Sequence, residues 1–111
     1  SVQMYHNPKC SKSRQTLALI KEKGIEPDIV EYLVNPPSVA ELKDVLAKLA
    51  LEPRDIVRRK EAREEGIAND LDGAALIEAI CKHPRALQRP IVVKDGKAAV
   101  GRPPENVLNI L

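Results

Sequence analysis

The sequence predicts an α/β fold whose mixed sheet is built from both ends of the chain, with an all-helical segment between them. Two observations lead to this expectation. Residues 2–33 show a strand, helix and strand pattern, and residues 90–111 show two short strands followed by a helix. Between them, about residues 38–83 carry only helical periodicity. The 111 residues, 43% of them hydrophobic, are expected to form one soluble domain, 1–111.

The N-terminal segment predicts a βαβ unit. Val2–Tyr5 is short and partly apolar, as in a strand that ends at a loop. A helix is expected from Ser11, because apolar residues then recur every three or four positions, and Gly24 is a natural stop. Residues 28–33, DIVEYL, are β-branched and aromatic enough for a second strand. Strand, helix and parallel strand form a crossover that is almost always right-handed.

The middle segment carries several helix starts. Residues 38–41 form a capping box of Ser and Glu that opens one helix. A first-turn proline at position 53 predicts another helix through residues 53–60. Asp70 or Asp72 is expected to cap a third helix, which ends at His83 before a proline.

The C-terminal segment predicts a hairpin and a last helix. Residues 90–93 are apolar and β-branched, residues 94–97 are a Lys-Asp-Gly-Lys turn, and residues 98–100 return as a strand. Residues 103–111 close the chain as a short helix. The whole architecture matches a thioredoxin-like sheet that carries an inserted helical lobe.

Charge and cysteine content exclude several classes of function. A net charge of +2 with interleaved acids and bases gives little support for nucleic-acid binding. No apolar run approaches the roughly 18 residues of a membrane span, so no membrane association and a cytoplasmic location are expected. Cys10 and Cys81 lie far apart, which argues against a structural disulfide, and no metal-ligand spacing is present. No metal or bound cofactor is therefore predicted.

Residues 6–14, HNPKCSKSR, place one cysteine just before a helix start. A thiolate is the nucleophilic form of cysteine, and unpaired N–H groups at a helix N-terminus favour it. A protonated His6, the hydroxyl of Ser13 and the charge of Arg14 could add to this stabilisation. Because the same N–H groups can bind an oxyanion, Cys10 is predicted to attack a phosphate-like or arsenate-like centre.

Two other interpretations of the cysteines are open. Most single cysteines are buried small apolar side chains, and Cys81, on an apolar helix, is interpreted in this way. Phosphatase loops also combine a cysteine with an arginine, but with five residues between them. Only three residues separate Cys10 from Arg14, so that interpretation fits poorly.

Several motifs together resemble one family. They are Tyr5-His6-Asn7-Pro8-x-Cys10-x-x-Ser13-Arg14-x-Thr16-Leu17, Tyr32-Leu33-x-Asn35-Pro36-Pro37-Ser38, Arg89-Pro90-Ile91-Val92-Val93 and Gly101-Arg102-Pro103. In this order and spacing they resemble the glutaredoxin-linked arsenate reductase (ArsC) family. Its fold is thioredoxin-like with a helical insertion, which agrees with the architecture expected above.

The resemblance implies a reaction. Cys10 would attack arsenate, glutathione would then act as co-substrate by displacing an oxygen at arsenic, and glutaredoxin would supply a second thiol before arsenite leaves. His6 matches the histidine thought to lower the pKa of the cysteine. Pro90 would be the cis-proline that faces the nucleophile.

The resemblance also implies three oxyanion-binding arginines, matched segment by segment to Arg58, Arg89 and Arg102. A guanidinium suits this role because its planar fork meets two oxygens at once. Arg58 has basic neighbours, and a slip of one residue would select Arg59 instead. The other two arginines each lie beside a proline, which anchors their alignment.

The Cys-Ser-Lys-Ser sequence at residues 10–13 differs from the Gly-Thr version of other reductases and resembles the chromosomal branch of the family.

Two rival functions are open for a protein with these motifs. One is a glutathione-dependent thiol-disulfide reductase, which would need Cys10 but tolerate loss of Arg102. The other is a non-enzymatic, redox-responsive transcription regulator of a sister group that uses Cys-x-x-Cys, whose second cysteine is replaced here by Ser13. A monomer is expected.

Overall fold

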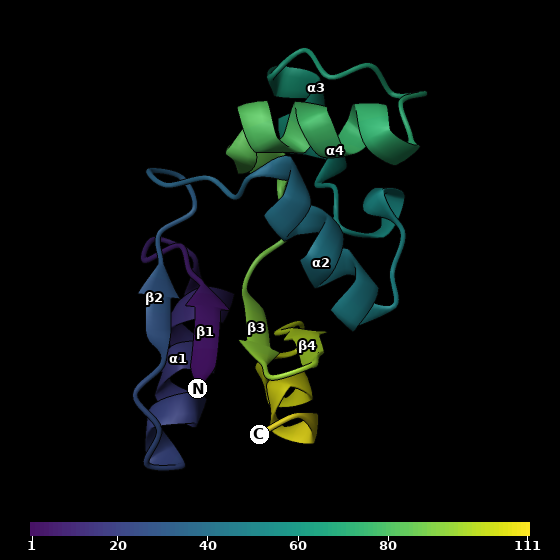
Figure 1. Cartoon of the computed structure of the whole chain (residues 1–111). Coiled ribbons are helices and arrows are strands. Elements are labelled where there is room, and N and C mark those ends of the chain that lie inside the picture. Colours follow the sequence, from purple (N-terminus) through teal and green to yellow (C-terminus); the bar gives the residue numbers. More distant parts are fainter. The chain divides into compact units, whose positions relative to one another are not determined.

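The computed structural model describes residues 1–111, which divide into two compact units (Figure 1). One unit combines both ends of the chain, 1–35 and 89–111, and the other is the intervening segment 36–88. The first unit holds the sheet and the second holds most of the helices. This division follows the expected sheet with an inserted helical lobe.

The first unit contains a four-stranded mixed sheet and the helices that cover it. Its elements are β1 (Val2–Tyr5), α1 (Ser11–Glu22), β2 (Asp28–Val30), β3 (Ile91–Lys94), β4 (Lys97–Val100) and the 3₁₀ helix η3 (Pro104–Asn109). The strand order is β2-β1-β3-β4. β1 pairs parallel with β2 and antiparallel with β3, and β3 and β4 form the hairpin. The α/β fold class is thereby confirmed, since strands from both ends of the chain meet in one sheet.

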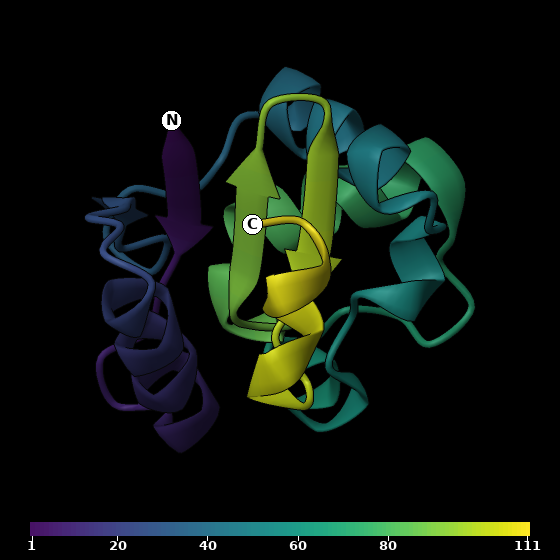
Figure 2. The same ribbon diagram turned by 90° about the horizontal axis from the view of Figure 1, so that it is seen from below.

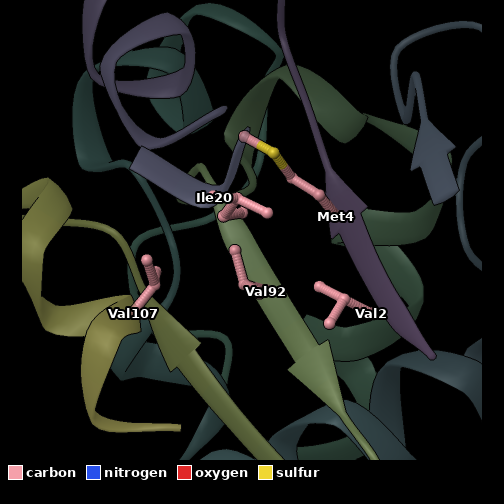
Figure 3. Packing of buried hydrophobic residues seen from close by; sticks show 5 residues of the cluster. All are labelled: Val2, Met4, Ile20, Val92 and Val107. Atoms are coloured by element: carbon pink, nitrogen blue, oxygen red, sulfur yellow. The ribbon is translucent and has the colours of Figure 1, made fainter. Parts of the chain in front are cut away.

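One apolar cluster holds this unit together (Figure 3). It is formed by Val2 and Met4 of β1, Ile20 of α1, Val92 of β3 and Val107 of η3, all of them buried. α1 and η3 also pack against each other, and both can be followed in Figure 2. Burial of such side chains stabilises a fold by about 1.5–3 kcal/mol each, so the cluster fixes α1 to the sheet.

The second unit is helical. Its elements are α2 (Val39–Leu49), the 3₁₀ helix η1 (Pro53–Asp55), α3 (Arg59–Glu64), α4 (Gly73–Lys82) and the 3₁₀ helix η2 (Pro84–Ala86). The capping box is confirmed, because Ser38 and Glu41 exchange side-chain to backbone hydrogen bonds of 3.1 Å. Asp72, rather than Asp70, is the N-cap of α4. α2 packs on α4 around a core that includes Leu42, Leu46, Leu76 and Ile80.

The helix expected over residues 53–60 is wrong. η1 ends at Asp55, and the chain then extends so that Val57 forms an isolated antiparallel bridge with Leu87. The backbone N–H of Arg58 donates to the carbonyl of Ala86 at 2.7 Å. Ile56 and Val57 are buried by this pairing. Pairing with a segment some thirty residues away therefore replaces the local helix, and Arg58 becomes the N-cap of α3.

Two other elements differ from expectation. β2 ends at Val30, because the carbonyl of Glu31 accepts the N–H groups of Val34 and Asn35 and closes a turn. The last helix is a 3₁₀ helix rather than an α-helix. No helix of the structure has both the length and the apolar content needed to cross a membrane.

Candidate active site

The loop between β1 and α1 is held by hydrogen bonds around Asn7. The Asn7 carbonyl accepts the N–H of Cys10 at 3.0 Å, and its side-chain Oδ1 accepts the N–H of Lys9 at 3.0 Å. The N–H of Asn7 donates to the hydroxyl of Ser13 at 3.3 Å. These contacts fix the backbone that presents Cys10 at the end of the sheet.

Cys10 is the N-cap residue of α1 and is half-buried. Burial alone raises the pKa of its thiol. The backbone N–H groups of Ser13 and Lys12, the Ser13 hydroxyl and the charge of Arg102 act in the opposite direction. Their combined effect outweighs that of burial, so the pKa of Cys10 lies below its ordinary value. The helix N-terminus thus stabilises a thiolate, as the sequence indicated.

Arg102 reaches the sulfur from the far end of the chain. Its Nη2 lies 3.7 Å from Sγ of Cys10, and its Nε donates to the Arg89 carbonyl at 2.8 Å. The Arg89–Pro90 bond is cis, as expected, and the Arg102–Pro103 bond is also cis. The guanidinium is therefore held by the chain just before the cis-proline and points at the nucleophile. The backbone of Arg89 belongs to the same cluster, whereas anion binding by its side chain stays a prediction.

Gly101 allows this approach. Its N–H donates to the Pro90 carbonyl at 2.9 Å. A Cβ at position 101 would lie 2.5 Å from Thr16 Oγ1 of α1 and 2.8 Å from Pro90 Cγ. No side chain fits between them, so only glycine lets the segment before Arg102 pass this close to the nucleophile helix. In the sequence, Asn7 and Gly101 were named only as members of the family motifs, and neither of them was assigned a role.

His6 and Arg14 are the two other residues of the loop segment that were predicted to activate Cys10. His6 is buried, and burial is the main reason why the pKa of its imidazole lies below the ordinary value; Glu31 acts to raise this pKa and Arg14 to lower it. The imidazole is therefore neutral near pH 7. A protonated His6 beside the sulfur stays a prediction, and this pKa weighs against it. Arg14 Nη1 donates to the Pro8 carbonyl at 3.0 Å, so its contact is with the loop.

Arg58 lies in the helical unit. Its Nη1 donates to Gln88 Oε1 at 3.1 Å, and its Nε lies 3.3 Å from Glu61 Oε2. Its role toward an oxyanion stays a prediction. Cys81, in the same unit, is half-buried rather than part of the closed core. Burial first, and Glu41 second, raise the pKa of the Cys81 thiol, so it is less reactive than Cys10.

The family model described as ArsC family matches residues 5–110. This chain belongs to the ArsC family. The matched range covers the Cys10 loop, the helical unit and the Arg89 to Arg102 segment, so every residue named in the predicted site lies inside it.

The ArsC-family protein has relatives that match along almost their whole length. An arsenate reductase of Neisseria meningitidis serogroup A is 48% identical, with 99% of this chain and 97% of the relative covered. The uncharacterized protein YfgD of Escherichia coli K12 is also 48% identical, over 99% of this chain and 96% of YfgD. The solved structure of an arsenate reductase from Vibrio cholerae matches with a TM-score of 0.92 at 48% identity, covering 99% of this chain and 97% of that one. The ArsC-type, thioredoxin-like fold is thereby shown.

Proposed function

We propose that this protein is an arsenate reductase in which Cys10 is the single nucleophile and glutathione and glutaredoxin supply the electrons. The observation that carries the proposal is the pairing of Sγ of Cys10 with the Arg102 guanidinium at 3.7 Å, on a thiol whose pKa is lowered. A nucleophile therefore lies next to a cation that can bind an oxyanion. The names of two of the relatives described above support arsenate as the substrate.

The proposed steps balance in atoms and electrons. The Cys10 thiolate attacks arsenic, and one arsenate oxygen leaves as water after protonation, so arsenic remains As(V). The glutathione thiol displaces a second oxygen as water. A glutaredoxin thiolate then attacks the glutathione sulfur, two electrons pass to arsenic, and a glutathione–glutaredoxin disulfide departs. Water finally replaces the Cys10 sulfur on As(III), which releases arsenite and returns the thiolate.

The arginines would act on the negative charge of arsenate. Arg102 is at the sulfur, and its planar guanidinium can donate to two oxygens of a tetrahedral anion. We propose Arg89 and Arg58 as further oxyanion ligands on the family resemblance. The use of cellular thiols fits a reducing, cytoplasmic location, which we include in the proposal. A monomeric state is proposed as well.

A coupled assay tests the function. NADPH oxidation is followed with arsenate, glutathione, glutaredoxin and glutathione reductase, for the wild type and for Cys10→Ser. Saturable turnover that is lost in Cys10→Ser is expected. Cys81→Ser is the matched control and should keep turnover, because the thiol of Cys81 has a raised pKa. Turnover that survives in Cys10→Ser would exclude Cys10 as the nucleophile.

The same assay separates the rival reductase. If the wild type fails to reduce arsenate but reduces a glutathione mixed disulfide, the function is thiol-disulfide exchange. Arg102→Lys is then expected to have little effect, since no oxyanion must be held. For an arsenate reductase the same change should lower kcat/KM for arsenate by about tenfold or more, because a lysine cannot make the bidentate contact.

A further inference from the structure

A groove adjoins the Cys10 loop where β1 and its neighbour β2 end, whereas Arg102 follows β4, on the other side of β1 in the strand order. It is lined by His6, Asn7, Pro8 and Lys9 of the loop and by Glu31, Leu33 and Val34 of the turn after β2, and its volume is about 270 Å³. Both lining segments follow directly from neighbouring parallel strands, β1 and β2. Ligands of open α/β sheets commonly bind outside the carboxyl ends of such strands.

The groove has the features of a small-molecule site. Leu33 and Val34 are large apolar side chains that are 41% and 75% exposed. Lys9 places a positive charge on one wall of the groove, and Glu31 places a negative charge on the other. Its volume is near the lower end, about 300 Å³, of pockets that hold small molecules. It therefore suits a short peptide that carries both a carboxylate and an ammonium group.

We propose that this groove binds the co-substrate glutathione, with a glutathione carboxylate at Lys9, its ammonium group at Glu31 and its cysteinyl portion along Leu33 and Val34. This inference rests on the proposed function, which requires a thiol peptide, and adds where that peptide binds. The charge pairing is complementary, since glutathione is a tripeptide with two carboxylates and one ammonium group.

The position of the groove gives the bound thiol a short path to the nucleophile. Lys9 immediately precedes Cys10, so their Cα atoms are about 3.8 Å apart. The Asn7 carbonyl, from another lining residue, binds the N–H of Cys10 at 3.0 Å. The groove thus adjoins the backbone that carries Cys10, and we propose that a tripeptide bound there brings its thiol to a group held on the Cys10 sulfur. Arg102 remains available for the oxyanion.

The test is a binding titration in the Cys10→Ser background, which blocks covalent chemistry. Reduced glutathione is added under anaerobic conditions, and amide chemical shifts are followed by ¹H–¹⁵N NMR. Shifts are expected in residues 6–9 and 31–34. Lys9→Glu and Glu31→Lys should each raise the Kd for glutathione about threefold or more, as for loss of an exposed ion pair. Both residues are exposed, so the folded spectrum should be retained.

Lys97→Glu in β4 is the matched control, because it reverses an exposed charge outside the groove and should leave the Kd unchanged. The proposal is overturned if glutathione gives no saturable shifts, if the shifts lie elsewhere, or if both groove variants bind like the parent. Shifts in the groove that appear only on addition of glutaredoxin would also overturn it. The arsenate assay is a separate measurement. Groove binding without arsenate turnover would reject only the proposed function. Arsenate turnover without groove binding would reject only this inference.

Discussion

At the scale of single residues, Ser13 acts on Cys10 through two groups, its backbone N–H and its hydroxyl. Ser13→Ala removes the hydroxyl and leaves the N–H of Asn7 without that acceptor. A hydrogen bond to a charged group contributes about 1.5–3 kcal/mol. We therefore expect alkylation of Cys10 by iodoacetamide at pH 7 to slow about tenfold, with a higher pKa in the pH profile. Ser11→Ala, an exposed position on the same turn, should match the wild type; equal profiles for both variants would contradict the assignment.

His6 gives a second prediction at this scale, on stability against pH. Its pKa is lower in the folded protein than its ordinary value of 6.5, mainly because of burial. Below pH 6.5 the unfolded chain therefore binds more protons than the folded one, and the free energy of unfolding falls as the pH falls. His6→Gln should reduce this loss between pH 7 and pH 5 in urea denaturation. An unchanged slope in His6→Gln would contradict the argument.

Site residues could be predicted from local sequence when their contacts are to neighbours in the chain, and not when their contacts are to distant segments. Cys10 and Ser13 could be chosen from local rules, because an N-cap position and the first helical turn lie next to each other in the chain. The closeness of Arg102 to Cys10, which are 92 residues apart, was predicted only from the family resemblance. The space that excludes a side chain at Gly101 depends on two other segments and leaves no local signal.

At the scale of elements, the approach of the Gly101 segment to α1 sets the place of Arg102. Gly101→Ala would put a Cβ against Thr16 and Pro90. Overpacking of this kind costs about 1–3 kcal/mol, so a lower urea midpoint is expected, together with a higher pKa of Cys10 as Arg102 moves away. Gly96→Ala is the control, since a Cβ there meets nothing within 4 Å.

A second variant makes the mechanism of this effect visible. Thr16→Ala in the Gly101→Ala background removes the side-chain atoms at 2.5 and 3.2 Å, although Pro90 Cγ at 2.8 Å remains. Partial recovery of the Cys10 alkylation profile is expected. A profile that never changed in Gly101→Ala would mean that Arg102 is not positioned by this contact.

Elements with strong local signals were predicted well. The capping box of α2, the strand β1 and the β3–β4 hairpin are confirmed, because each depends on residues that are neighbours in the chain. The expected helix over residues 53–60 failed for the opposite reason. The pairing of Val57 with Leu87 and of Arg58 with Ala86 is long-range, and Ile56 is fully buried next to it. A local pattern cannot show such a pairing.

At the scale of the whole molecule, the three arginines proposed as oxyanion ligands lie in separate segments of the chain. Arg89 and Arg102 belong to the sheet unit, whereas Arg58 belongs to the helical unit. Arg102 Nε donates to the Arg89 carbonyl, which holds the Arg102 side chain against the backbone of Arg89. For the third arginine, the sequence left Arg58 and Arg59 as alternatives. They differ in exposure: Arg58 is half-buried beside Gln88, and Arg59 is exposed.

Arsenate affinity distinguishes these two residues. Arg58→Lys and Arg59→Lys both keep the positive charge, and only the true ligand loses a planar fork when changed to lysine. In the Cys10→Ser background, Arg58→Lys is expected to raise the Kd of arsenate about tenfold by calorimetry, and Arg59→Lys to leave it unchanged. Urea midpoints of both variants show whether the loss of the Gln88 contact disturbs the helical unit. The converse pattern would assign the role to Arg59, and no effect in either variant would remove both residues from the proposed oxyanion ligands.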